Sequence, residues 1–168
     1  GADVPGWRDI PANQAKKNFV IALRQRGYYQ VKIESESGHL KISTGSVTKI
    51  RDVQFVNPPP RFFDMTFVGV EGNILNSESL DKIKKWSASR MRSIGYPCPK
   101  LEIRGVPETG IVEVTLEPGE LERFERVGRK TGGEVDALAI SRFDAFRLDG
   151  PYNADLLQLT SRRIMRSG

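Results

Sequence analysis

Residues that commonly carry enzyme chemistry are scarce in this chain of 168 residues, which has a single histidine, His39, and a single cysteine, Cys98. A catalytic cysteine needs a base within hydrogen-bond reach. His39 lies in a polar turn without organised partners, and Cys98 stands between two prolines. One histidine and one cysteine cannot complete a zinc site, and the carboxylates lack the spacing of a calcium loop. We therefore expect no catalytic residue, no metal site and no cofactor.

Two glycine turns are the remaining candidates for a cofactor site, GVEGN at residues 69–73 and TGGE at residues 131–134. A phosphate-binding loop lies between a strand and a helix and is followed by Lys-Ser/Thr or by an acidic residue at a set distance. Neither turn has this context, so both are interpreted as loops. The sequence predicts a protein that is not an enzyme.

The composition is that of a globular protein, with 38% hydrophobic and 28% charged residues. The longest apolar run is FVIAL at residues 19–23, far below the ~20 residues of a membrane span. No secretory leader opens the chain as given. We expect it to behave as a soluble protein.

The net charge of +5 raises the alternative that the chain binds nucleic acid. Basic and acidic residues number seven and four in residues 1–45, ten and nine in 46–119, and nine and eight in 120–168. The surplus is therefore spread along the chain. The densest basic cluster suits the C-terminal half of a helix, and the aromatic residues fit core positions better than a stacking surface. This cluster comprises Lys82, Lys84, Lys85, Arg90 and Arg92.

A repeat organises the chain. RQRGY at residues 24–28 corresponds to RSIGY at 92–96 and to MRSG at 165–168. Each is preceded by apolar residues at helical spacing, and each helix is expected to end at its glycine, which can adopt a left-handed conformation. The first two copies continue into hairpins with alternating strands, YYQVKIE with HLKIS and KLEIRG with IVEVTLE.

A second pair of similar segments follows the hairpins, TGSVTKIRDVQF at residues 44–55 and PGELERFERVGR at 118–129. Their apolar positions align, with Val47, Ile50 and Val53 matching Leu121, Phe124 and Val127. Only a residue or two separates each hairpin from the next strand. Such short linkers favour a stiff tandem arrangement.

One complete repeat is predicted, with the order β-α-α-β-β. It consists of a strand at residues 47–55, a short helix at 61–67, a long helix at 79–94 capped by Asn76 or Ser77, and the hairpin. We predict a partial repeat at residues 1–45, this complete repeat at 46–118, and a partial repeat at 119–168. The last has a strand, a short helix at 135–142 and a long helix. We also expect its missing hairpin, and the missing first strand of the first repeat, to allow concentration-dependent association of the chain with itself.

These features resemble polypeptide-transport-associated (POTRA) domains of BamA- and TamA-like outer-membrane assembly proteins. The resemblance rests on the β-α-α-β-β order, the period of about seventy residues, the Gly-Tyr helix ends, PGELERFERV, and DGPYNADLLQLTSRRIMRSG at the C-terminal end. The chain is most similar to the three-domain arm of the barrel protein of the translocation and assembly module. Main insertases and two-partner secretion transporters use the same repeat. The compact segment after NPPP at residues 57–60 departs from the usual pattern.

The resemblance implies an α+β fold of tandem repeats, each a three-stranded mixed sheet with two helices on one face. It implies a location in the periplasm of a Gram-negative bacterium, in front of the protein's own C-terminal β-barrel. The partners would be unfolded outer-membrane or secreted polypeptides and a periplasmic or inner-membrane accessory protein, with no nucleic acid.

Such domains bind extended polypeptide by adding it to a sheet edge, which is usually the first strand of the hairpin. In this chain these strands are expected at residues 29–34 and 100–104. The predicted polypeptide-binding residues are Tyr29, Val31, Lys32, Ile33, Lys100, Leu101, Glu102 and Ile103.

Overall fold

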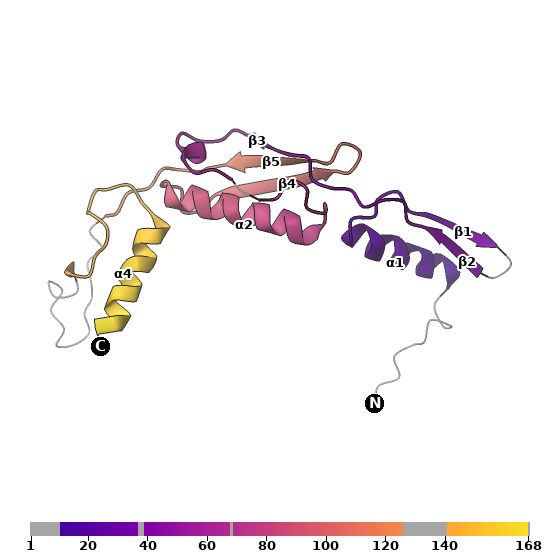
Figure 1. The fold of residues 1–168 in the computed structure, drawn as a ribbon. Coiled ribbons are helices and arrows are strands. Elements are labelled where there is room, and N and C mark those ends of the chain that lie inside the picture. Colours follow the sequence, from indigo (N-terminus) through magenta and orange to yellow (C-terminus); the bar gives the residue numbers. More distant parts are fainter. Residues whose placement is uncertain (1–10, 37–38, 68, 126–140, 168) are drawn as a thin grey trace, which may run out of the picture. The chain divides into compact units, whose positions relative to one another are not determined.

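The computed structural model describes residues 11–36, 39–67, 69–125 and 141–167. Their elements follow the order α1 (Ala12–Gln25), β1 (Lys32–Glu36), β2 (His39–Ser43), β3 (Asp52–Val56), η2 (Phe62–Asp64), α2 (Ser77–Ser93), β4 (Lys100–Val106), β5 (Ile111–Glu117) and α4 (Ala154–Ser167) (Figure 1). Strands β1 and β2 form an antiparallel two-stranded sheet, and the second sheet has the order β3-β5-β4. The predicted α+β fold is confirmed. In the part of the chain so described, no helix has both the length and the apolar character that crossing a membrane requires.

The chain divides into two compact units, which are described separately. The first unit comprises residues 1–54, 69–83 and 103–113, and the second comprises 55–68, 84–102 and 114–168. The boundaries of the three predicted repeats are not tested by this division and stay a prediction.

Each unit has its own apolar core. In the first unit the buried residues include Ile50, Leu75, Ile83 and Val112, all 1% exposed or less. In the second unit they are Phe62, Met91, Val114, Leu116 and Phe124. Strand β5 alternates strictly, so that Val112, Val114 and Leu116 are buried while the residues between them are half-buried. Because every second side chain of a strand points to the same face, this pattern places one face of β5 in the core.

The long helix α2, predicted at 79–94, covers Ser77–Ser93, and its cap and its glycine end are as predicted. The Oδ1 atom of Asn76 accepts a hydrogen bond from the backbone N–H of Ser79 at 2.9 Å, so Asn76 is the N-cap. Gly27 and Gly95, which follow α1 and α2, have φ angles of 90° and 113°. These left-handed conformations confirm two of the three predicted helix ends, and the third, Gly168, lies outside the described residues.

The strand and the short helix predicted for the complete repeat are wrong in extent. Strand β3 covers only Asp52–Val56, because the residues before it hydrogen-bond to the segment that precedes α2 and not to the sheet. The predicted helix at 61–67 is a single 3₁₀ turn, Phe62–Asp64, because left-handed backbone at Arg61 precedes it and extended backbone at Met65, with φ −116° and ψ 130°, ends it. Residues 135–140 of the other predicted short helix lie outside the described residues.

The aromatic residues predicted to be in the core are only partly interior, because Phe62 and Phe124 are buried whereas Phe55, Phe67, Phe143 and Phe146 are half-buried. Phe55 contacts Phe62 and Trp86 with ring centroids 5.1 and 6.0 Å apart, and Phe124 stacks on Phe146 at 4.1 Å. Phe63 is an exception, because 60% of its surface is exposed. It touches Phe55 and Phe62 only along the edge of this cluster.

Candidate functional site

Strand β4 carries half of the predicted polypeptide-binding residues and lies at an edge of its sheet. Its neighbour is β5 alone, so one side of its backbone has no strand partner among the described residues. Lys100, Glu102 and Arg104 are exposed, while Leu101 and Ile103 are half-buried. Within the described residues, no side chain hydrogen-bonds to the backbone from Lys100 to Arg104. This edge can accept the backbone of another extended chain.

The opposite edge, β3, is less open to such pairing. The Oδ1 atom of Asp52 accepts the backbone N–H of Val53 at 2.9 Å, and Oδ2 accepts the side-chain amide of Gln54 at 3.1 Å. The strand is then followed by Asn57 and three prolines, which cannot donate hydrogen bonds. Prolines and engaged amides are common protections of sheet edges. Of the two edges, β4 is the better candidate.

The other four predicted residues are divided between β1 and the segment before it. Lys32 and Ile33 lie on β1, opposite Ser43 and Ile42 of β2. Tyr29 and Val31 precede β1, which begins three residues later than predicted. The strand starts late because Tyr29 is held elsewhere, its hydroxyl donating to the carbonyl oxygen of Leu75 at 3.0 Å. Burial raises the pKa of this phenol, and the positive charge of Arg24 opposes the shift.

In the first unit, a short ladder of backbone hydrogen bonds joins the end of α1 to the segment before β3. We call it the first junction (residues 27–29, 48–50 and 72–75). The N–H of Thr48 donates to the carbonyl of Gly27 at 2.9 Å, and the N–H of Leu75 donates to the carbonyl of Thr48 at 2.8 Å. Lys49 and Ile74 form an antiparallel bridge between them. The linker is therefore hydrogen-bonded on both sides.

In the second unit, the end of α2 is joined in the same way, in what we call the second junction (residues 95, 121–124 and 149–152). Glu122 donates to the carbonyl of Gly95 at 2.9 Å, Tyr152 donates to that of Glu122 at 2.9 Å, and Arg123 bridges Pro151. Each backbone donor of the ladder in the first junction has a counterpart here. The similarity between the two segments noticed in the sequence thus extends to their backbone hydrogen bonds.

The basic cluster of α2 is largely engaged in local contacts. Lys82 pairs with Glu78 at 2.7 Å, and this contact holds the pKa of the Glu78 carboxyl below its usual value. Arg90 is buried and donates from Nε to the carbonyl of Phe62 at 2.8 Å and from its second terminal nitrogen to that of Arg61. Arg92 donates to the carbonyl of Pro97 at 3.3 Å. A phosphate-binding surface needs cationic side chains that are free to contact phosphates. These contacts leave few such side chains in the basic cluster of α2.

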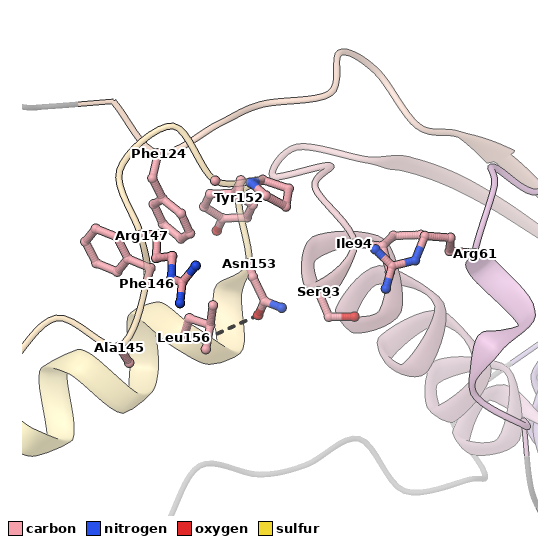
Figure 2. Close-up of a pocket in the computed structure, with 12 residues that line it drawn as sticks. Arg61, Ser93, Ile94, Phe124, Ala145, Phe146, Arg147, Tyr152, Asn153 and Leu156 are labelled. Atoms are coloured by element: carbon pink, nitrogen blue, oxygen red, sulfur yellow. Dashed lines mark hydrogen bonds between the residues drawn. The ribbon is translucent and has the colours of Figure 1, made fainter.

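A cavity of about 360 Å³ adjoins the second junction. Figure 2 shows its lining residues coming from the end of α2, from the segment around Phe124, from the loop before α4 and from the start of α4. Ile94, Phe124, Phe146 and Leu156 supply apolar surface, and the guanidinium of Arg147 lies between Phe146 and Asn153. A second cavity, of about 480 Å³ and lined mainly by backbone and polar groups of residues 46–51 and 107–110, adjoins the first junction.

Sequence reasoning missed the polar residues that the structure buries. Ser79, Ser87 and Arg90 share the buried stripe of α2 with Ile83 and Met91. Only their spacing of three, four and eight residues along the helix could have indicated this. The segments 72–75 and 149–152 of the junctions were also missed, because they have no periodic pattern.

The chain was compared with known proteins. No protein-family model matches it, and no curated protein matches it. Among solved structures it is similar to POTRA domains 3–5 of BamA from Haemophilus influenzae, with 11% identity, a TM-score of 0.53, and coverage of 92% of this chain and 70% of that one. It is also similar to BamA from Haemophilus ducreyi lacking POTRA domains 1–3, with 12% identity, a TM-score of 0.54, and coverage of 72% of this chain and 24% of that one.

These likenesses identify the fold as that of tandem POTRA domains, and the prediction of this fold is confirmed. The finer resemblance to the translocation and assembly module stays a prediction.

Proposed function

We propose that this chain is the periplasmic POTRA region of an outer-membrane β-barrel assembly or translocation protein and that it binds extended polypeptides by strand addition at β4. The proposal covers binding and no catalysis. Within it, the partners are unfolded outer-membrane or secreted polypeptides, the protein's own β-barrel, and an accessory protein of the periplasm or inner membrane.

The observation that carries this proposal is the open edge of β4. Its backbone has no strand partner on one side, its residues alternate between exposed and half-buried, and the competing edge at β3 is protected by Asp52 and the prolines. Pairing through backbone groups is nearly indifferent to side chains, so one edge can receive many sequences. The likeness to BamA POTRA domains supports the proposal that this binding serves outer-membrane assembly or translocation.

Backbone-modified peptides test the mechanism. The probe is a ten-residue peptide of alternating apolar and polar residues, the pattern of an outer-membrane strand. Two further peptides of the same sequence carry N-methyl groups on one or the other alternate set of amides. Because only one set faces the added strand, one methylated peptide should bind as the parent does and the other should lose about tenfold or more in affinity. Equal binding of all three would overturn strand addition.

The binding strand is located by a matched pair of charge variants. Exchanging the charges on β4, as Lys100→Glu together with Glu102→Lys, should change the preference for charged peptides while leaving the backbone able to pair. The same exchange at Lys82 and Glu78 on α2 preserves their ion pair and should leave peptide binding unchanged.

A further inference from the structure

The cavity at the second junction combines apolar walls with cationic and amide donors. Phe124 is buried and stacked on Phe146 at 4.1 Å with 17° between the ring planes, and Ile94, which follows α2, also lines the cavity. These surfaces favour an apolar group. With about 360 Å³, the cavity lies near the lower end of the ~300–1,000 Å³ range of ligand pockets. It suits one ring or a short branched chain.

The polar groups of the cavity are donors whose partners are incomplete. Among the described residues, the guanidinium of Arg147 has no hydrogen-bond or ion-pair partner. The side chain of Asn153 is oriented by its Oδ1 atom, which accepts the backbone N–H groups of Asp155 and Leu156 at 2.9 and 3.2 Å. Its Nδ2 group is directed away from the helix end, toward the Ser93 side of the cavity and not toward Arg147 (Figure 2). The planar guanidinium of Arg147 by itself carries two parallel N–H groups that match the two oxygens of a carboxylate.

The other arginine of the lining does not compete for this role. Arg61 pairs with Asp64 at 3.1 Å, so its charge is already balanced. The uncompensated charge of the cavity is therefore that of Arg147, and it calls for a single anionic group.

We propose that this cavity binds a carboxylate attached to a compact apolar group. The apolar part lies against Ile94, Phe124 and Leu156, and the carboxylate accepts hydrogen bonds from Arg147. Two sources have this chemistry, a small free carboxylic acid and the C-terminal residue of a polypeptide. The site does not depend on strand addition, because none of its lining residues belongs to β4.

The test is an amide-shift NMR titration of the whole chain with N-acetyl-phenylalanine and with its carboxamide. The acid should produce saturable shifts at Ile94, Phe146 and Asn153. The carboxamide, which lacks the charge, should bind about tenfold or more weakly. A third titration uses a short peptide that ends in phenylalanine with a free carboxylate. Tighter binding of the peptide than of the acid supports the site and assigns the source as a polypeptide end, whereas equal affinity supports the site and assigns it to small acids.

Two variants locate the anion. Arg147→Met keeps an unbranched apolar stem and should weaken binding of the acid by about tenfold, while Arg166→Met, which removes an exposed charge in the last turn of α4, should leave it unchanged. The proposal would be overturned by the absence of saturable shifts with all three probes, by equal binding of the acid and its carboxamide, or by unchanged binding in Arg147→Met.

Discussion

In the first junction Thr48 donates to the carbonyl of Gly27, and in the second Glu122 donates to that of Gly95, at 2.9 Å in both. The bridges Lys49–Ile74 and Arg123–Pro151 occupy equivalent places. The side chains around these two matching sets of backbone hydrogen bonds differ. The first junction has Ile50, Ile74 and a tyrosine hydroxyl bond, whereas the second has a stack of Phe124 on Phe146 and an apolar cavity with an arginine. The comparison indicates that the two joints share their backbone hydrogen bonds and differ in the side chains that pack around them.

The largest expected effect comes from the two glycines at the joints. A methyl group on Gly27 would collide with the Cγ2 atom of Ile74 and lie 3.3 Å from the carbonyl oxygen of Leu75, whereas one on Gly95 would meet the end of the exposed Leu121 side chain. Leucine can rotate away, but a β-branched isoleucine is stiff. Gly27→Ala should therefore lower the free energy of unfolding by about 3 kcal/mol, and Gly95→Ala by about 1–2 kcal/mol.

Urea denaturation followed by circular dichroism measures both effects. Amide hydrogen exchange at Thr48 and Glu122 then shows which junction has opened. Gly72→Ala is the control, since Gly72 also has a left-handed φ of 81° but no atom within 4 Å of the added carbon. An effect of Gly95→Ala as large as that of Gly27→Ala would contradict the proposed difference between the joints.

Exchanging the equivalent core residues should have a smaller effect. Phe124→Ile gives the second junction the residue of the first and loses the stack on Phe146, with an expected destabilisation of about 2 kcal/mol. Ile50→Phe places a ring where the side chain is 1% exposed, and overpacking should destabilise by ~1–3 kcal/mol. Ile50→Val is the control, because it shows how much stability is lost when the residue at position 50 changes without overpacking. If Phe is tolerated at position 50 without loss in thermal unfolding experiments, the two joints are interchangeable.

Loss of the Tyr29 hydroxyl should have an effect of about 1 kcal/mol, the usual contribution of one hydrogen bond. Tyr29→Phe removes the donor to Leu75, and Pro97 at the corresponding place of the second junction has no such group. Hydrogen exchange at Leu75 should therefore become faster, while exchange at Tyr152 stays as it is. Tyr28→Phe serves as the neighbouring control. Equal responses at both amides would mean that the hydroxyl does not act locally.

The smallest effect concerns alkaline pH. Burial raises the pKa of Tyr29 in the folded protein, and the unfolded chain releases the same proton near pH 10. The folded state thus holds more protons above that pH, so this contribution to stability is complete below about pH 10 and is lost as the pH rises through the raised pKa. The difference in urea midpoint between the natural chain and Tyr29→Phe should shrink over this range. A constant difference would show that Tyr29 does not titrate differently on folding.

The sequence predicted those parts of the fold that local pattern determines. Glycines 27 and 95 marked helix ends, alternation marked β4 and β5, and Asn76 marked a cap, because each depends on neighbouring residues. The extent of β3 could not be predicted, since residues 48–50 pair with a loop that has no pattern of its own. The burial of Arg90 was hidden for a similar reason, because a basic residue near a helix C-terminus is equally well explained by the helix dipole.

The candidate site could be predicted only in part. The residues of β4 were identified by their alternation, but their position at a sheet edge follows from the order β3-β5-β4, which depends on tertiary pairing. The cavity at the second junction brings Ile94 and Leu156 together across a separation of more than sixty residues. No short-range pattern in the sequence predicts that these two residues line the same cavity.

An amide-shift titration with the alternating ten-residue peptide, repeated with a short DNA duplex, tests the proposed function most directly. Strand addition predicts saturable shifts concentrated on β4, from Lys100 to Val106, with the peptide, and little salt-sensitive response to DNA. Shifts along Lys82 to Arg92 with DNA that vanish as salt is added, together with no response of β4 to the peptide, would contradict polypeptide binding and identify the basic surplus as the functional feature.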